Sequence, residues 1–102
     1  MARMDRVGKH ATTIAYDRET GMQILTFHST QVVKWDGEKI VLDSGGWETP
    51  TTKARMNQCS WQYGLDFQVY QRNWEWFVDY GENDKIPFFD GIVLCRQDKT
   101  WL

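Results

Sequence analysis

The residues best suited to bind a ligand lie together between positions 44 and 58. Paired glycines there permit positive φ angles, and a helix predicted to begin just after them exposes N–H groups and partial positive charge. Threonine hydroxyls and two cations follow. This combination could hold a phosphate or a carboxylate, and an indole ring could stack on a base. The candidate binding residues are Gly45, Gly46, Trp47, Thr49, Thr51, Thr52, Lys53, Arg55 and Asn57, together with His28.

Two other interpretations of the same segment stay open. In a purely structural one, the threonines cap the helix, Pro50 fixes its first turn, Gly45 and Gly46 form the turn, and Trp47 fills the core. In the other, the segment contacts a protein. The P-loop spacing, GxxxxGK followed by Ser or Thr, is absent, so a P-loop is not expected.

Residue types that support catalysis are present but poorly placed. His28 and Cys59 could form a base and nucleophile pair if they were close in space. However, Cys59 falls on the apolar stripe of the predicted helix, away from the terminus that would lower its pKa. His10 and His28 lack metal-ligand spacing, and Glu75 and Asp79 would lie roughly 13 Å apart along a strand. We therefore expect no catalytic residue, no metal, no cofactor and no enzymatic activity.

The candidate residues are positioned by two groups of strands and one helix. Alternation of apolar and polar residues predicts three or four strands before the helix and three or four after it, and Asp36-Gly37 is the strongest hairpin signal. Thr49 as cap, Pro50 at the first position and Gly64 as terminator predict a helix over about 50–63. The predicted fold is α+β: a bent antiparallel sheet of about six or seven strands, able to curl toward a half-barrel, with this helix packed across it.

Length and composition predict a single domain over residues 11–102, preceded by a polar N-terminal arm at residues 1–10 that is flexible or laid on the surface. Six Trp, four Tyr and five Phe could fill the core or line a binding face. Trp74, Trp76, Val78 and Tyr80 are predicted to share one strand face. We interpret that face as core, with a protein contact and a nucleic-acid platform as alternatives.

The charge pattern gives little support to polyanionic partners. The net charge is −2 and both signs are mixed along the chain, so no field attracts nucleic acid or an anionic membrane. No apolar stretch is long enough to span a membrane, and a secretory signal is not evident. Cys59 and Cys95 are therefore expected to be reduced thiols in a cytoplasm.

The segment from Gly45 to Gln58 resembles the signature of a group of small bacteriophage-encoded proteins of unassigned function. In that group a Gly-Trp pair precedes spaced threonines and an Arg-X-Asn helix start. Two flanking pieces are also similar, His28–Val33 and Trp74–Tyr80, the latter followed by Ile86-Pro87-Phe88, so the resemblance covers about residues 25–94. It implies a virus of bacteria and a host-cytoplasm setting, and it implies no activity.

These observations predict a non-enzymatic phage protein that binds a host protein or complex, for host takeover or inhibition of antiviral defence, in the cytoplasm of the infected bacterial host. The alternative is a binder of a nucleotide or other anion at the Gly45–Arg55 junction, acting as a sponge for a defence signal. A second alternative is DNA or RNA binding. Assembly into a homo-oligomer stays open, and no membrane partner is expected.

Overall fold

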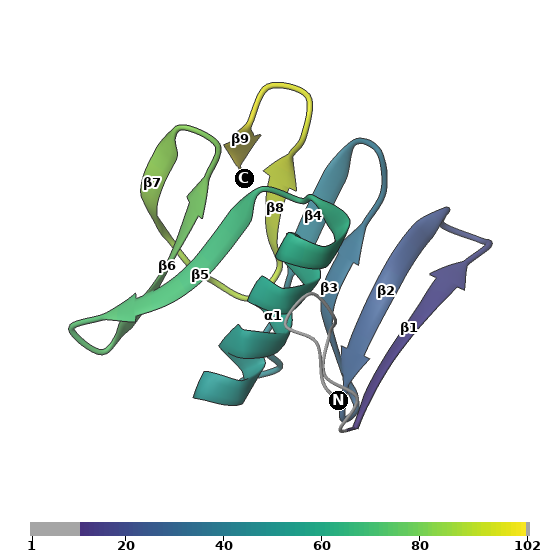
Figure 1. The fold of residues 1–102 in the computed structure, drawn as a ribbon, viewed down its shortest axis with the longest axis horizontal. Helices are drawn as coiled ribbons and strands as arrows, with labels where there is room; N and C mark the ends of the chain where they lie inside the picture. Colours follow the sequence, from purple (N-terminus) through teal and green to yellow (C-terminus); the bar gives the residue numbers. More distant parts are fainter. Residues whose placement is uncertain (1–10, 102) are drawn as a thin grey trace.

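The computed structural model describes residues 11–101, so the predicted N-terminal arm at residues 1–10 lies outside the described residues. The described part of the chain contains nine strands and one helix, and Figure 1 shows how they are arranged. In chain order they are β1 (Thr12–Asp17), β2 (Met22–Phe27), β3 (Thr30–Trp35), β4 (Lys39–Leu42), α1 (Pro50–Tyr63), β5 (Phe67–Arg72), β6 (Glu75–Tyr80), β7 (Asn83–Pro87), β8 (Ile92–Cys95) and β9 (Thr100–Trp101).

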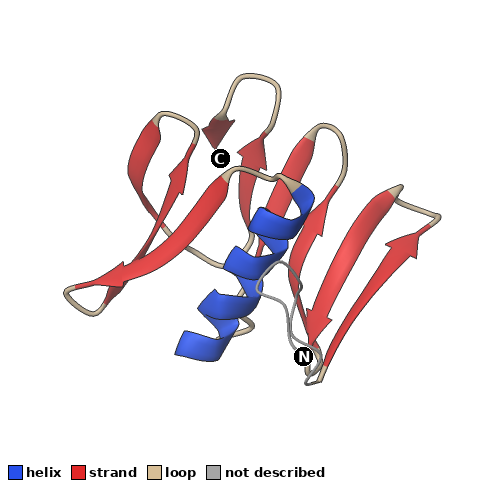
Figure 2. Ribbon diagram, viewed as in Figure 1, coloured by secondary structure: helices blue, strands red, loops and turns tan. Residues whose placement is uncertain are grey.

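The strands form two antiparallel sheets (Figure 2). The larger sheet has the order β1-β2-β3-β4-β8-β9 and the smaller one the order β5-β6-β7. The α+β class, with one helix and antiparallel strands, is confirmed. The division into two sheets was not predicted, and the described strands do not close into a barrel. The nine strands exceed the predicted six or seven, and β9 is a two-residue pairing with β8 that carries no alternating pattern.

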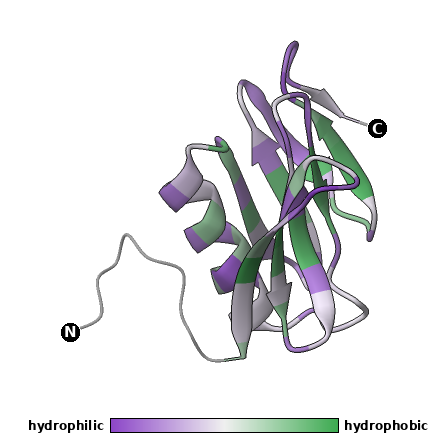
Figure 3. Cartoon of the chain, turned by 90° about the vertical axis from the view of Figure 1, so that its right-hand side faces the viewer, coloured by the Kyte–Doolittle hydropathy of each residue, from purple (hydrophilic) through white to green (hydrophobic). Residues whose placement is uncertain are grey.

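Helix α1 packs against β2 and β3 of the larger sheet and against β5 of the smaller one. Its bounds agree with the prediction because local signals at both ends set them. The Thr49 side chain accepts a hydrogen bond from the N–H of Thr52, Pro50 begins the helix, and Gly64 ends it at a φ of 65°. Hydrophilic residues lie on the outer side of the helix (Figure 3), as expected for a helix that buries one face.

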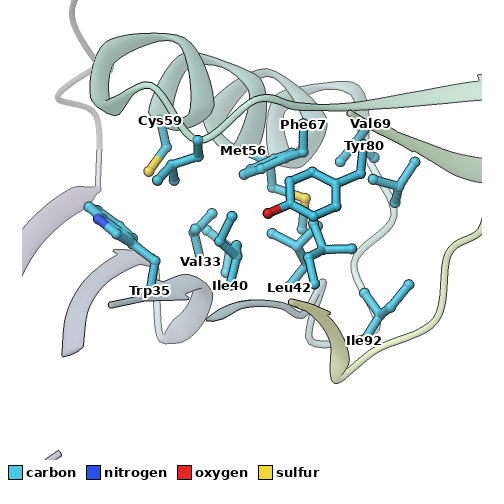
Figure 4. Close-up of a cluster of buried hydrophobic side chains, with 14 of the residues drawn as sticks. Val33, Trp35, Ile40, Leu42, Met56, Cys59, Phe67, Val69, Tyr80 and Ile92 are labelled. Atoms are coloured by element: carbon cyan, nitrogen blue, oxygen red, sulfur yellow. The ribbon is translucent and has the colours of Figure 1, made fainter. Parts of the chain in front are cut away.

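One hydrophobic core joins both sheets and α1. In Figure 4, Met56 and Cys59 of the helix and Tyr80 of β6 face strands β3 and β4 of the larger sheet. The predicted common face of β6 is confirmed for Trp76, Val78 and Tyr80, all of which are buried. The core also includes Leu25, Val33, Trp35, Ile40, Leu42, Leu65, Phe67, Val69, Ile92 and Leu94.

Trp74 does not share that face, and the prediction was wrong for this residue. Asn73 and Trp74 form the two-residue turn between β5 and β6, with φ angles of 54° and 69°. Positive φ at both positions is the geometry of a tight hairpin turn, which Asn adopts readily. The indole is consequently 89% exposed at the hairpin tip.

The Tyr80 side chain is fully buried, and its hydroxyl has no hydrogen-bond partner among the described residues. An unpaired buried hydroxyl costs about 1–3 kcal/mol. Phenylalanine would fill the same space and keep the ring 4.8 Å from the Lys99 ammonium. We expect Tyr80→Phe to raise the free energy of unfolding by about 1 kcal/mol, measured by urea denaturation.

Tyr63→Phe is the matched control for this prediction, because the Tyr63 side chain is exposed. It should leave the urea midpoint nearly unchanged. A loss of stability in Tyr80→Phe would contradict the account, since it would show that the hydroxyl is paired in solution.

Candidate binding pocket

A pocket of about 550 Å³ lies where the turn between β2 and β3 meets the loop that leads into α1. We call it the junction pocket. Among the described residues that line it, none is Asp, Glu, Lys or Arg, and their side chains are aromatic, aliphatic or hydroxyl-bearing. The lining residues are Phe27, His28, Ser29, Thr30, Val32, Ser44, Trp47, Thr49, Thr51 and Thr52.

The loop before α1 is held in place by Asp90, which follows β7. Both the N–H and the hydroxyl of Ser44 donate hydrogen bonds to Asp90 Oδ1, each 2.7 Å long. The Ser44 hydroxyl in turn accepts the N–H of Gly46 at 3.2 Å, and the Ser44 carbonyl accepts the N–H of Trp47 at 3.0 Å. Ser44 is buried, so these bonds fix the loop from within the molecule and set the position of Trp47 at the pocket.

Gly45 and Gly46 both adopt positive φ angles, 65° and 83°, as their sequence predicts. Gly45 has a further constraint because it packs against the turn that forms the other wall of the pocket. A Cβ at this position would lie 2.5 Å from Thr30 Oγ1, whereas a Cβ on Gly46 would meet nothing within 4 Å. The close approach of Gly45 to Thr30 therefore brings the two walls together.

The three predicted threonines lie at the pocket, but they do not have the same surroundings. Thr49 and Thr52 are hydrogen-bonded to each other: their hydroxyls are 3.0 Å apart, and the Thr52 N–H donates to Thr49 Oγ1 at 3.2 Å. Thr52 is buried, whereas Thr51 is exposed. Capping of the helix thus occupies two of the hydroxyls, and Thr51 presents its side chain at the surface.

The two predicted aromatic residues at the pocket are exposed. Trp47 is 70% exposed, so the interpretation of Trp47 as a core residue is wrong. The loop that carries it turns back on Ser44 and keeps the indole outside the core. His28 lies in the turn between β2 and β3 with a φ of 56°, and its ring packs 4.4 Å from that of Phe27.

The two predicted cations do not line the pocket. Lys53 Nζ donates to Gln71 Oε1 at 3.3 Å and lies 5.4 Å from the ring of Trp76. Arg55 Nε donates to Thr12 Oγ1 at 3.1 Å. Lys53 therefore ties α1 to the smaller sheet, and Arg55 ties α1 to the larger one.

The Arg55 guanidinium also lies 5.4 Å from the ring of Phe27, whose side chain reaches the pocket. Such cation–π contacts contribute about 0.5–2 kcal/mol. Arg55 thus supports the pocket wall through Phe27 without lining the pocket itself.

Asn57 binds the backbone of β5. Its side-chain amide donates to the Val69 carbonyl at 2.8 Å, and its side-chain oxygen accepts the Val69 N–H at 2.7 Å. One helical turn later, the Ser60 hydroxyl makes the equivalent pair of bonds to the backbone of Phe67, at 2.7 and 3.0 Å. The side chains of Asn57 and Ser60 thus bond to backbone N–H and C=O groups of β5 that would otherwise pair with a neighbouring strand. Asn57 does not line the pocket.

The proposed partners of a nucleophilic site do not form one. Cys59 is buried on the inner face of α1, and this burial raises the pKa of its thiol to about 12. The thiolate, which is the reactive form, is therefore not populated near neutral pH. Cys59 and Cys95 are both free thiols. Within residues 11–101, His, Cys, Asp and Glu side chains form no group of three that could hold a metal.

Several residues of the site were not among the candidates. Phe27, Ser29, Thr30 and Ser44 line the pocket, and Asp90 fixes Ser44. The sequence did point to the turn before β3, because this turn belongs to His28–Val33, one of the pieces that resemble the phage protein group. No pattern connects Asp90 with Ser44, which is 46 positions away along the chain.

A family model for the Kyanoviridae Gp96 protein matches residues 1–95. The chain belongs to this bacteriophage protein family. The phage origin that the resemblance implied is thereby confirmed. No curated protein and no solved structure matches the chain. In the part of the chain that the structure describes, no helix is long and apolar enough to cross a membrane.

Proposed function

We propose that this Gp96 family protein acts without catalysis, by binding a host protein or complex at the junction pocket. The observation that carries the proposal is Trp47, which is 70% exposed beside a pocket whose described lining residues include no Asp, Glu, Lys or Arg. The buried centres of protein interfaces are enriched in Trp and depleted of charged residues. Trp is also among the residues whose truncation costs most binding energy.

The pocket has the size and chemistry to receive side chains of a partner. Its volume of about 550 Å³ lies within the range of about 300–1,000 Å³ that holds small ligands. The rings of Phe27 and Trp47 offer apolar contact, and the Thr51 hydroxyl can bond a polar group of the partner. The Ser44–Asp90 bonds hold one wall in advance, which reduces the entropy lost on binding.

Capture of a nucleotide at the same place receives less support. The helix N-terminus and the two glycines still favour an anion, but the side chains of Lys53 and Arg55 bond to other parts of the chain. A bound phosphate would therefore face hydroxyls and the His28 ring, and no Lys or Arg among residues 11–101 lines the pocket to neutralise it. Nucleic-acid binding has the same weakness, since phosphate neutralisation by cations supplies most of its affinity.

The family places this protein in a phage that infects bacteria. We propose that it acts in the cytoplasm of the infected host, in host takeover or in inhibition of an antiviral defence. A partner identified from host lysate with the wild-type protein as bait would decide between these two roles.

Trp47→Ala is expected to weaken binding of the purified partner by about 30-fold or more, which corresponds to about 2 kcal/mol for an interface hot spot. The measurement is calorimetric titration of the partner identified from host lysate. The fold should be unaffected, because the indole is mostly exposed.

Trp74→Ala is the matched control, since it removes an equally large indole, 89% exposed, from the tip of the β5–β6 hairpin. It should retain wild-type affinity. Equal losses in both variants would count against the junction pocket. Retention of a nucleotide by the wild-type protein in native mass spectrometry would favour the small-molecule alternative.

A further inference from the structure

The N-terminal arm, residues 1–10, joins the described fold beside the junction pocket. It is attached at Ala11, whose carbonyl accepts a 2.7 Å hydrogen bond from the N–H of His28, a residue that lines the pocket. The next residue, Thr12, lies opposite Phe27, whose side chain also reaches the pocket. The arm is therefore tethered at one wall of the pocket.

The geometry of this tether leaves the pocket within reach of the arm. Ala11 has a φ of 50°, in the left-handed region that residues other than Gly adopt rarely, so the backbone turns at Ala11 before it enters β1. Each residue spans at most about 3.3–3.6 Å, so Val7 can lie up to roughly 14 Å from Ala11 and Met4 up to roughly 24 Å. Both residues can consequently reach the pocket.

The apolar residues of the arm are regularly spaced. The larger ones recur at every third position, as Met1, Met4 and Val7. In a polyproline II segment, which has three residues per turn, this spacing places them on one side. The described lining of the junction pocket is aromatic, aliphatic or hydroxyl-bearing. Because Met side chains adapt to irregular apolar surfaces, this side of the arm matches the pocket.

The charge of the arm is opposite to that of the rest of the chain. The arm contains one acid, Asp5, and three cations, which are Arg3, Arg6 and Lys9. It therefore contributes +2 to the chain's net charge of −2, which leaves −4 on residues 11–102. The loop at residues 43–49, which forms part of the pocket, carries Asp43 and Glu48 and no Lys or Arg. Electrostatic attraction thus favours contact between the arm and this loop.

The arm is also part of what the family shares. The Gp96 family model matches residues 1–95, so the match includes the arm and ends before β9. The arm therefore belongs to the sequence that defines the family, together with the residues that line the pocket.

We propose that the N-terminal arm of the same chain occupies the junction pocket in the free protein, with Met4 and Val7 against the rings of Phe27 and Trp47, and that the host partner displaces it. A tethered segment has an effective concentration in the millimolar range, so even a weak contact fills the pocket. The apparent affinity for the partner then falls in proportion to the fraction of molecules whose pocket is open. The displacement rests on the proposed function, whereas the occupancy does not.

Photo-crosslinking within the purified full chain tests the occupancy without any partner. A photoreactive residue in place of Thr51, at the exposed rim of the pocket, should link to residues 1–10 at the mass of a single chain. The same residue in place of Trp74, at the tip of the β5–β6 hairpin, should not link to the arm. The absence of a link from position 51 to the arm, or links that form only between two chains, would overturn the proposal.

Substitution of the apolar residues of the arm tests the displacement. In the full chain, Met4→Ser combined with Val7→Ser should raise the affinity for the purified host partner about tenfold, the effect expected if the arm fills nine-tenths of the pockets. Ala2→Ser combined with Gly8→Ser is the matched control, because it introduces the same two side chains and keeps Met4 and Val7. It should bind the partner as the wild type does.

The occupancy and the proposed function fail in different ways. If Trp47→Ala left the affinity for the partner unchanged, the proposed function would fail, and links from position 51 to the arm would still support the occupancy. If Trp47→Ala weakened binding while the substitutions at Met4 and Val7 left the affinity unchanged, the arm would not compete with the partner, and the displacement would be overturned.

Discussion

Asn57→Ala is expected to lower the free energy of unfolding by about 2–4 kcal/mol. The substitution removes both bonds to Val69, at 2.8 and 2.7 Å, and leaves an N–H and a C=O of β5 without their partners. Unpaired buried backbone groups cost about 1–3 kcal/mol each, and water entering the gap recovers part of this. Chemical denaturation followed by circular dichroism measures the change.

Two further variants show whether the loss comes from β5. Ser60→Ala removes the equivalent pair of bonds to Phe67 and should also destabilise the protein. Trp61→Ala alters an exposed helix position, 64% accessible, and should change stability little. If Asn57→Ala proved as mild as Trp61→Ala, the attachment of α1 to β5 would not be a main source of stability.

Gly45→Ala is expected to lower the free energy of unfolding by about 2–4 kcal/mol. Its φ of 65° is unfavourable for alanine, and the new Cβ would lie 2.5 Å from Thr30 Oγ1. Gly46→Ala is an unusually close control: its φ is 83°, but its Cβ would meet nothing within 4 Å. It should cost only about 1–2 kcal/mol, the strain of the left-handed backbone.

The difference between the two glycine variants isolates the contact with Thr30. Adding Thr30→Ala to the Gly45→Ala variant removes the two nearest atoms and should restore part of the lost stability, while the Thr30 Cβ, at 3.1 Å, remains close. Equal costs for Gly45→Ala and Gly46→Ala would contradict the close approach of the two pocket walls.

The elements that local signals control were predictable from the sequence. The helix agrees at both ends, because the cap, Pro50 and Gly64 act within a few residues. The division of the strands into two sheets was not predictable. It depends on the side chains of Asn57 and Ser60 in α1, which bond to β5 where a further strand would otherwise pair. The alternation of apolar and polar residues along the strands does not predict such a contact. The prediction for Trp74 failed for a different reason, because a two-residue turn interrupts the alternation of inward and outward side chains.

The candidate site was located correctly as a region but only in part as a set of side chains. His28, Trp47 and the three threonines meet at one pocket. Lys53, Arg55 and Asn57 lie nearby in sequence, but successive helix positions point in different directions, and these three bind the two sheets. The Arg-X-Asn part of the signature thus has a structural explanation, and the Gly-Trp part belongs to the pocket.

The central claim, that the junction pocket is the surface this protein uses in its host, is tested most directly by site-specific photo-crosslinking in infected cells. A photoreactive residue in place of Thr51, at the exposed rim of the pocket, should capture one defined host protein. The same residue in place of Trp74, at the hairpin tip, should capture none. Capture of the same protein from position 74 and not from position 51 would contradict the account.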